Sequence, residues 1–481
     1  MIRDLHEKLI NQEITSEKLT EDYFSRIEKK DSEIKAFLSL NKELALDQAR
    51  SVDQKIKNGE KIDILAGIPC AIKDNICAEG LPVTAGSKIL ENFVSPYDAT
   101  VIDKLKKSGS VFLGKTNLDE FAMGSSTENS AYQVTRNPND AGRVAGGSSG
   151  GSVVAVAADE CAWALGSDTG GSIRQPASFC GVVGLKPTYG LVSRYGLIAM
   201  ASSLDQIGPI TKTVEDAAII LGRITGQDSR DATTADQNKK NYEAGLTGEI
   251  KNVRIGVPKE YFASVGLDPQ VRKIIEAALK KYESLGAKIV EISLPSGEFA
   301  LATYYIIMPS EVSSNLARFD GIRYGQSIEK EIAIEENITL TDIYFRSRAK
   351  YLGKEVKRRI MLGTYALSAG YYDQYYLKAQ KVRSLIRREF EEAFQKVDVI
   401  AGPTSPTPAF KIGEKIDNPL EMYLSDIYTV TANIAGIPAI SIPVGEIENG
   451  TKQLPVGLQL SGKWFGEETL LNTAYAWEKN N

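Results

Sequence analysis

Two glycine-rich segments, GGSSGGS at 146–152 and GSDTGGS at 166–172, carry serines that can act as nucleophiles. Eleven of the residues between 142 and 190 are glycine. Because a glycine in a regular element costs roughly 0.5–1 kcal/mol, this density indicates special backbone conformations or close contact with a ligand. The apolar run between the segments is a buried helix or strand that brings both loops together. Glycine content alone is equally compatible with a structural turn or a phosphate-binding loop.

The second loop ends in a serine that follows two residues without side chains. It reads Asp168-Thr169-Gly170-Gly171-Ser172. Unobstructed backbone N–H groups of this kind can converge on one oxygen, which is how an oxyanion hole is built. The loop is therefore compatible with acyl chemistry in which Ser172 attacks a carbonyl carbon.

The base for such a nucleophile must be something other than histidine. The chain has one histidine, His6, in the first turns of an expected surface helix, and no visible zinc-ligand cluster. Lys73 follows the apolar run Ile68–Ile72, so its stem is expected to point inward. Burial disfavours the ammonium and lowers its pKa, and a partly neutral lysine can accept a serine proton. An ordinary solvated lysine is the alternative interpretation.

Composition excludes several classes of protein. The net charge of −5 argues against this chain binding nucleic acid by itself, since such binding requires a basic face. The N-terminus lacks the apolar core of a signal peptide, and no run of 18 uncharged apolar residues predicts a membrane span. The sparse cysteines are expected to be reduced thiols in a cytoplasmic protein; they are Cys70, Cys77, Cys161 and Cys180.

One motif is a decoy. Residues 109–116 match the phosphate-loop pattern GxxxxGK[ST]. A phosphate loop follows a strand and opens a helix, whereas Gly109 follows a helical run and is better interpreted as its C-cap. Residues 111–113 then form a buried strand, so no ATP site is predicted here.

The pattern of apolar, charged and glycine residues divides the chain into four regions, which together are expected to form one α/β unit. Residues 1–60 are helical, with Leu19, Tyr23 and Ile27 at helical spacing and Thr15 or Ser16 as a cap. Short apolar runs broken by glycine then fill the signature core at 61–225, and a largely helical insertion covers 226–400. Residues 401–481 return to sheet texture, which indicates one compact domain over 1–481.

The glycine loops together with GIPCAIKDN at 67–75 resemble the amidase signature family. The resemblance implies a large mixed twisted β-sheet covered by helices on both faces. It also implies a Ser-cisSer-Lys triad in which Ser172 is the nucleophile, Ser148 the bridging serine at a cis peptide, and Lys73 the base. The implied oxyanion donors are the N–H groups of Thr169, Gly170, Gly171 and Ser172. A departure, Val144-Ala145 where the family often has a proline, affects nothing catalytic.

Further segments resemble one branch of the family, the glutaminase subunits of tRNA-dependent amidotransferases. They include NLDEFAMGSSTENS at 117–130, KRRIMLGTYALSAGYYD at 357–373 and TANIAGIPAISIPVG at 431–445. The resemblance implies that Arg359, or the adjacent Arg358, binds the carboxylate of glutamine and that Asp426 binds its ammonium. Tyr304 and Tyr305 are implied to line the pocket.

The same resemblance implies a heterotrimer with subunits B and C and no cofactor in this chain. Ammonia would pass to a partner that uses ATP and Mg to convert Glu-tRNA(Gln), or also Asp-tRNA(Asn), to the amidated product. Two other functions remain open: a stand-alone amidase acting on small or aryl amides, and a catalytically silent scaffold in a tRNA-modifying complex.

Overall fold

The computed structural model describes residues 1–237, 240–263, 266–332 and 338–481. Its strands are β1 (Phe37–Leu40), β2 (Pro69–Lys73), β3 (Val111–Thr116), β4 (Arg136–Asn137), β5 (Asp140–Val144), β6 (Trp163–Asp168), β7 (Val183–Lys186), β8 (Gln206–Thr211), β9 (Arg254–Pro258), β10 (Lys288–Ile292), β11 (Val399–Pro403), β12 (Ala439–Asn449) and β13 (Lys452–Gly462).

The α-helices are α1 (Ile2–Ile10), α2 (Ser16–Ile34), α3 (Lys42–Lys57), α4 (Thr100–Lys107), α5 (Gly150–Ala157), α6 (Arg174–Cys180), α7 (Val214–Ile224), α8 (Lys259–Ala263), α9 (Pro269–Ser284), α10 (Ala300–Asn315), α11 (Glu329–Ile332), α12 (Leu340–Tyr351), α13 (Lys354–Leu367), α14 (Lys378–Lys396), α15 (Pro419–Tyr423), α16 (Val430–Ala435) and α17 (Glu467–Lys479). No helix in the described ranges is long and apolar enough to cross a bilayer.

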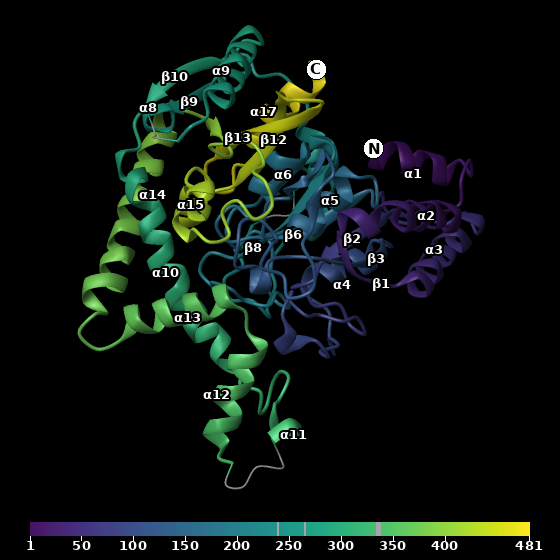
Figure 1. Cartoon of the computed structure of the whole chain (residues 1–481). Helices are drawn as coiled ribbons and strands as arrows, with labels where there is room; N and C mark the ends of the chain where they lie inside the picture. The colour runs from purple at the N-terminus through teal and green to yellow at the C-terminus, as the bar shows by residue number, and fades with distance from the viewer. Residues whose placement is uncertain (238–239, 264–265, 333–337) are drawn as a thin grey trace.

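A mixed sheet organises the molecule (Figure 1). Within the described residues it has 11 strands in the order β1-β3-β2-β6-β8-β7-β12-β13-β11-β9-β10. β2 runs parallel to both β3 and β6, whereas β12 and β13 form a long antiparallel hairpin in the middle of the sheet. Strands from the first and last hundred residues therefore share one sheet, and this confirms the predicted mixed α/β fold.

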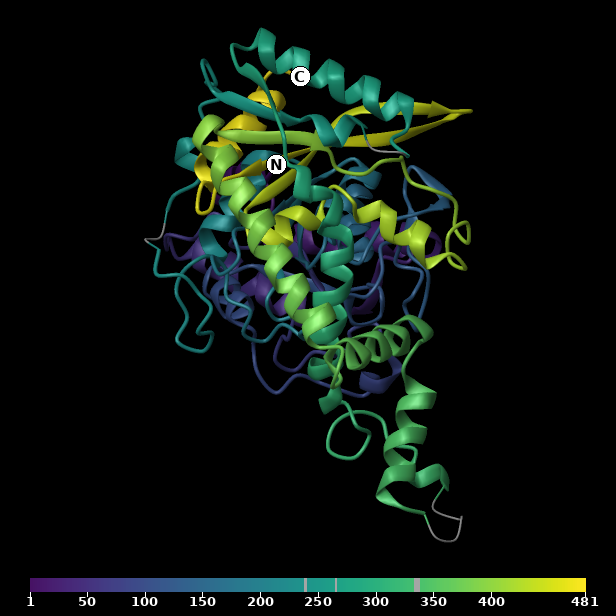
Figure 2. The same ribbon diagram turned by 90° about the vertical axis from the view of Figure 1, so that its left-hand side faces the viewer.

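Helices cover both faces of this sheet. Figure 2 shows α9 on one side of the β12–β13 hairpin and α10 and α14 on the other. The segment that carries α11 and α12 projects away from the body in both views.

Local sequence accounts for several boundaries. The Thr15 side chain accepts a hydrogen bond from Lys18 N–H at 3.1 Å and so caps α2, one of the two caps predicted. Leu19, Tyr23 and Ile27 lie in this helix as predicted, and all three are buried. The apolar run 153–158, which the sequence left open between helix and strand, belongs mostly to α5. β1 was missed because four residues that pair with only one neighbouring strand give little periodic signal.

The decoy motif folds as a structural element. α4 ends at Lys107, and its C-cap is Ser108 rather than the predicted Gly109. Gly109 is the next residue and adopts the left-handed conformation at φ +75°. Residues 111–116 form the fully buried β3. Lys115 points into the core, where its amine lies 3.1 Å from Asp74 Oδ1 and donates to the carbonyl of Ile76 at 2.9 Å.

Candidate active site

Two adjacent parallel strands place the candidate base beside the glycine loops. In the register of β2 and β6, Ile72 pairs with Leu165, so Lys73 and Asp168 emerge at the same edge of the sheet. The carboxyl ends of parallel strands are the usual position of ligand sites in α/β folds. The first glycine loop reaches this edge because α5 packs on β6 and begins at Gly150.

Lys73 is fully buried among serines, as the sequence predicted. Its amine lies 2.8 Å from each of three hydroxyls, those of Ser148, Ser149 and Ser167, and 3.2 Å from the Ser167 carbonyl. Burial lowers the pKa of Lys73 to about 7, against the opposing influence of buried aspartates, the largest being that of Asp119. An appreciable fraction of the amine is therefore neutral at physiological pH.

The hydrogen-bond directions make Ser148 well suited to pass a proton to Lys73. The Ser149 hydroxyl donates to the Ser167 carbonyl at 3.0 Å, so towards Lys73 it can only accept. The proton of Ser148 has no such competing acceptor among the described residues. The peptide between Gly147 and Ser148 is cis, as the resemblance implied.

Ser172 lies just before α6, and its residue is 7% exposed. Its carbonyl accepts a hydrogen bond from Ser149 N–H at 3.0 Å, which holds the two glycine loops against each other. Within the described residues its hydroxyl makes no hydrogen bond. The contact from Lys73 to Ser148 is thus formed, while the contact from Ser148 to Ser172 is not closed by a hydrogen bond in this structure.

The loop at 169–172 offers donors for an oxyanion. The N–H groups of Thr169, Gly170 and Ser172 have no hydrogen-bond acceptor among the described residues. Gly171 differs, because its N–H donates to Asp168 Oδ1 at 2.9 Å. Its assignment as an oxyanion donor therefore conflicts with the conformation in this structure, whereas the other three N–H groups remain available.

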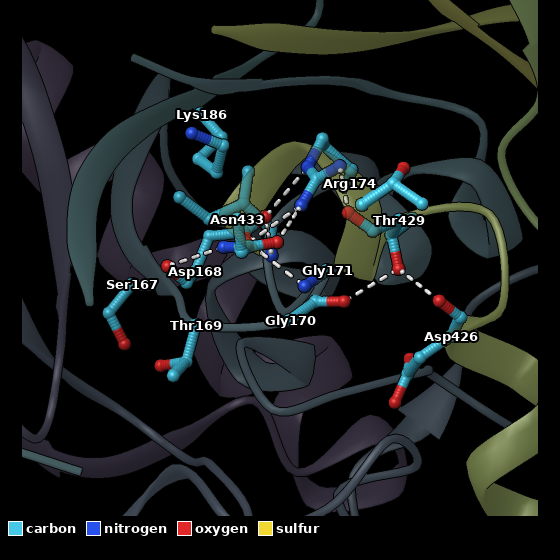
Figure 3. Close-up of polar contacts among 12 residues, drawn as sticks. Ser167, Asp168, Thr169, Gly170, Gly171, Arg174, Lys186, Asp426, Thr429 and Asn433 are labelled. Carbon is cyan, nitrogen blue, oxygen red and sulfur yellow. Dashed lines mark hydrogen bonds and ion pairs between the residues drawn. The ribbon is translucent and has the colours of Figure 1, made fainter. Parts of the chain in front are cut away.

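A buried ion pair holds this loop in place (Figure 3). Arg174 contacts the Asp168 carboxylate through two nitrogens, at 3.0 and 2.9 Å, and both residues are fully buried. Burial opposes ionisation of Asp168, but the Arg174 guanidinium outweighs it and holds the carboxyl pKa below its usual range. Asn433 also donates to Asp168 Oδ1, at 2.9 Å. A charged, fully bonded Asp168 is a rigid anchor for the N–H of Gly171.

The structure distinguishes the two adjacent arginines of α13. The Arg359 side chain is 3% exposed, whereas the Arg358 side chain is 43% exposed. Arg359 donates to Glu355 Oε1 at 2.8 Å, and its guanidinium lies over the rings of Tyr305 and Tyr423 at 5.4 and 5.5 Å. Its Nη2 makes no hydrogen bond among the described residues. Arg359 is therefore the fixed, inward-pointing cation.

Asp426 is a buried carboxyl near Tyr304. The Ser125 hydroxyl donates to its Oδ2 at 2.6 Å, and Oδ1 makes no hydrogen bond in the described part of the chain. Burial raises the pKa of Asp426 to about 7, although the hydrogen bond from Ser125 lowers it. A bound ammonium would favour the charged form.

Tyr304 packs against the oxyanion loop and lies close enough to Arg359 and Asp426 to be affected by both charges. A Cβ atom placed on Gly170 would lie 2.6 Å from the Tyr304 hydroxyl, so the ring lies directly against the loop. Burial raises the pKa of Tyr304, and the charges of Arg359 and Asp426 then act on it in opposite directions. Tyr305 contacts Tyr304 edge-on and stacks on Tyr423 at 3.9 Å. That these two tyrosines line the substrate pocket stays a prediction.

Sequence reasoning missed several polar residues of this site: Ser125, Glu355, Tyr423 and Thr429. Ser125, Tyr423 and Thr429 contact groups that lie far along the chain, so no local spacing identifies them. Glu355 alone had a signal, since it precedes Arg359 by one helical turn. Another buried lysine, Lys186, also has a pKa lowered by burial to about 7, but among the described residues its amine bonds only to the Pro187 carbonyl. Geometry, rather than pKa alone, identifies Lys73.

The chain belongs to the amidase family, since the family model described as Amidase matches residues 18–471. It is 58% identical over 479 residues to the A subunit of glutamyl-tRNA(Gln) amidotransferase from Caldanaerobacter subterraneus subsp. tengcongensis, covering 99% of this chain and 96% of the relative. The crystal structure of the corresponding A subunit from Thermotoga maritima is 46% identical with a TM-score of 0.80, covering 97% of this chain and 92% of that one. The native peptide amidase of Stenotrophomonas maltophilia is 31% identical with a TM-score of 0.80, covering 100% of this chain and 96% of that one.

Proposed function

We propose that this chain is the glutaminase subunit of a tRNA-dependent amidotransferase. The observation that carries the proposal is that a buried arginine, Arg359, and a buried carboxyl, Asp426, both lie close enough to Tyr304 to affect its pKa, and Tyr304 packs against Gly170 of the oxyanion loop. Free glutamine carries one carboxylate and one ammonium next to its α-carbon, so it requires one fixed charge of each sign. An aryl or alkyl amide requires neither.

In the proposed reaction, Ser172 attacks the side-chain amide of glutamine. Its proton passes through Ser148 to Lys73 as the new C–O bond forms, and the N–H groups of the loop stabilise the oxyanion. The same relay returns the proton to the leaving nitrogen, so ammonia departs and an acyl-enzyme remains. Water, activated by Lys73, then releases glutamate and restores Ser172.

The proposal extends to assembly through the names of the relatives, which are subunits of a larger enzyme. Residues 1–481 would act as one amidase domain in the cytoplasm, in a heterotrimer with subunits B and C. Ammonia would pass to a partner subunit that holds ATP and Mg and amidates Glu-tRNA(Gln), or also Asp-tRNA(Asn). The acidic balance of this chain supports leaving tRNA binding largely to the partners.

A stand-alone amidase is the second candidate, supported by the likeness to the peptide amidase. Turnover of glutamine compared with aryl amides by the purified chain separates the two. A chain that prefers aryl amides contradicts the glutaminase proposal.

The variant Ser172→Ala tests the assigned nucleophile. It is expected to abolish glutamine-dependent amidation of tRNA while leaving ammonia-dependent amidation by the assembled enzyme intact. Equal loss of both activities would show that Ser172 serves the assembly rather than the hydrolysis. Ser178→Ala, which removes a buried hydroxyl on α6 bonded to Gly457 N–H, is the matched control.

A further inference from the structure

The peptide unit between Gly170 and Gly171 is held at both ends (Figure 3). Its carbonyl accepts a hydrogen bond from the Thr429 hydroxyl at 2.6 Å. Its N–H donates to Asp168 Oδ1 at 2.9 Å. In a planar trans peptide the C=O and N–H point in opposite directions, so two partners on opposite sides fix the rotation of the plane.

Glycine is required on this peptide for steric reasons as well. Gly171 has φ +136°, and a Cβ atom there would lie 2.2 Å from the Thr429 hydroxyl oxygen. Thr429 is fully buried, so its hydroxyl has no access to solvent and is committed to protein acceptors. Its shorter contact is the one to Gly170.

Thr429 also belongs to the turn that carries Asp426. Its N–H donates to the Asp426 carbonyl at 3.0 Å, and its own carbonyl accepts from Arg174 Nη1 at 3.0 Å. The turn at 426–429 therefore contacts the oxyanion loop through Thr429 and carries Asp426, the carboxylate proposed to bind the substrate ammonium.

We propose that Thr429 is a positioning residue for the oxyanion hole: its hydroxyl fixes the Gly170–Gly171 peptide, and thereby the directions of the flanking N–H groups relative to Asp426. This inference rests on the proposed glutaminase function. The two hydrogen bonds that hold the Gly170–Gly171 peptide, from Thr429 to its carbonyl and from its N–H to Asp168, form what we call the clamp. Gly171 N–H is part of this clamp, while the N–H groups of Thr169, Gly170 and Ser172 are the oxyanion donors. Without the clamp, the peptide plane can rotate, and the neighbouring N–H groups no longer point at the position of the oxyanion.

The test compares two buried threonines of the same segment in the enzyme purified with its partner subunits. Thr429→Val keeps the shape of the side chain and removes the hydroxyl. Thr431→Val is the matched control, since the Thr431 hydroxyl makes only long contacts of 3.4 Å with Tyr261 and Tyr428 among those described here. Thr429→Ser keeps the hydroxyl and is the conservative rescue.

Thr429→Val is expected to lower kcat for glutamine hydrolysis by about 10- to 100-fold with KM changed by less than about threefold, since misaimed oxyanion donors act on the transition state. Thr429→Ser should recover most of kcat, and Thr431→Val should retain it. A kcat for Thr429→Val equal to that of Thr431→Val, or a change in KM alone, would overturn the proposal.

A replacement variant and an alternative substrate cover the two cases in which the comparison above cannot be made. If Thr429→Val fails to fold, Thr429→Ala removes the hydroxyl without placing a methyl group beside the Gly170 carbonyl, and the same loss in kcat is expected. If the wild-type enzyme does not hydrolyse glutamine, the proposed function fails. The clamp is then judged by the same kcat comparison on a primary amide that the wild-type enzyme does hydrolyse.

Discussion

Lys73 Nζ lies 2.8 Å from Ser148 Oγ although the two residues are separated by 75 positions in the chain. Both side chains are fully buried, so this contact is shielded from bulk solvent. The low pKa of the amine and the free proton of the hydroxyl make the pair a proton acceptor and donor in direct contact.

The activity should depend on pH through Lys73 and Asp426. Lys73 acts as a base only when neutral, above its pKa of about 7, and Asp426 binds an ammonium only when charged, above its pKa of about 7. Both are lost as the pH falls, so log kcat/KM for glutamine should fall below pH 7 with a slope approaching about 2.

Asp426→Asn should reduce this slope to about 1, because one of the two titrating groups is removed. Steady-state kinetics between about pH 5 and 9 measures both profiles. A wild-type profile that is flat across this range would rule out Lys73 as the titrating base.

Arg359 is expected to bind the substrate carboxylate. Arg359→Ala should raise KM for glutamine about 100-fold or more, since it removes the buried cation proposed to bind the substrate carboxylate. Arg358→Ala is the control and should change KM little, because that side chain is largely exposed. Glutamine lacking its α-carboxylate (4-aminobutanamide) should bind wild type and Arg359→Ala equally weakly. If Arg359→Ala binds this analogue much more weakly than the wild type does, Arg359 stabilises the fold rather than recognising the carboxylate.

Ser125 should tune the ionisation of Asp426. Its hydrogen bond favours the charged carboxylate, so Ser125→Ala should raise the pKa of Asp426 and move the acid limb of the kcat/KM profile upward by about one pH unit. Ser126→Ala is the control, since that hydroxyl contacts Glu128 N–H instead. If the kcat/KM profile of Ser125→Ala does not move, Asp426 is not one of the groups that titrate in that profile.

Lys115 should matter for stability rather than for nucleotide binding. Lys115→Ala leaves Asp74 buried without its countercharge, which is expected to cost about 3–5 kcal/mol of unfolding free energy. Lys107→Ala, which breaks an exposed pair with Asp103, should cost at most about 1 kcal/mol. Denaturant unfolding measures both, and ATP at millimolar concentration should stabilise neither the wild type nor the variants.

The sequence by itself determined the class of fold and the residue types of the catalytic centre. Glycine loops, one poorly placed histidine and a lysine at the end of an apolar strand leave few chemistries open. The burial of Lys73 follows from a local signal, because Ile72 and its neighbours form a buried strand.

Only the tertiary structure decided which groups meet. Arg358 and Arg359 are equivalent in the sequence, and packing of α13 against α10 makes one of them buried. Tyr423, Thr429 and Ser125 contact the site through side chains whose partners lie 68, 259 and 301 positions away. Periodicity and motifs describe neighbours along the chain, whereas these contacts depend on where β6, α13 and the turn before α16 come together in space.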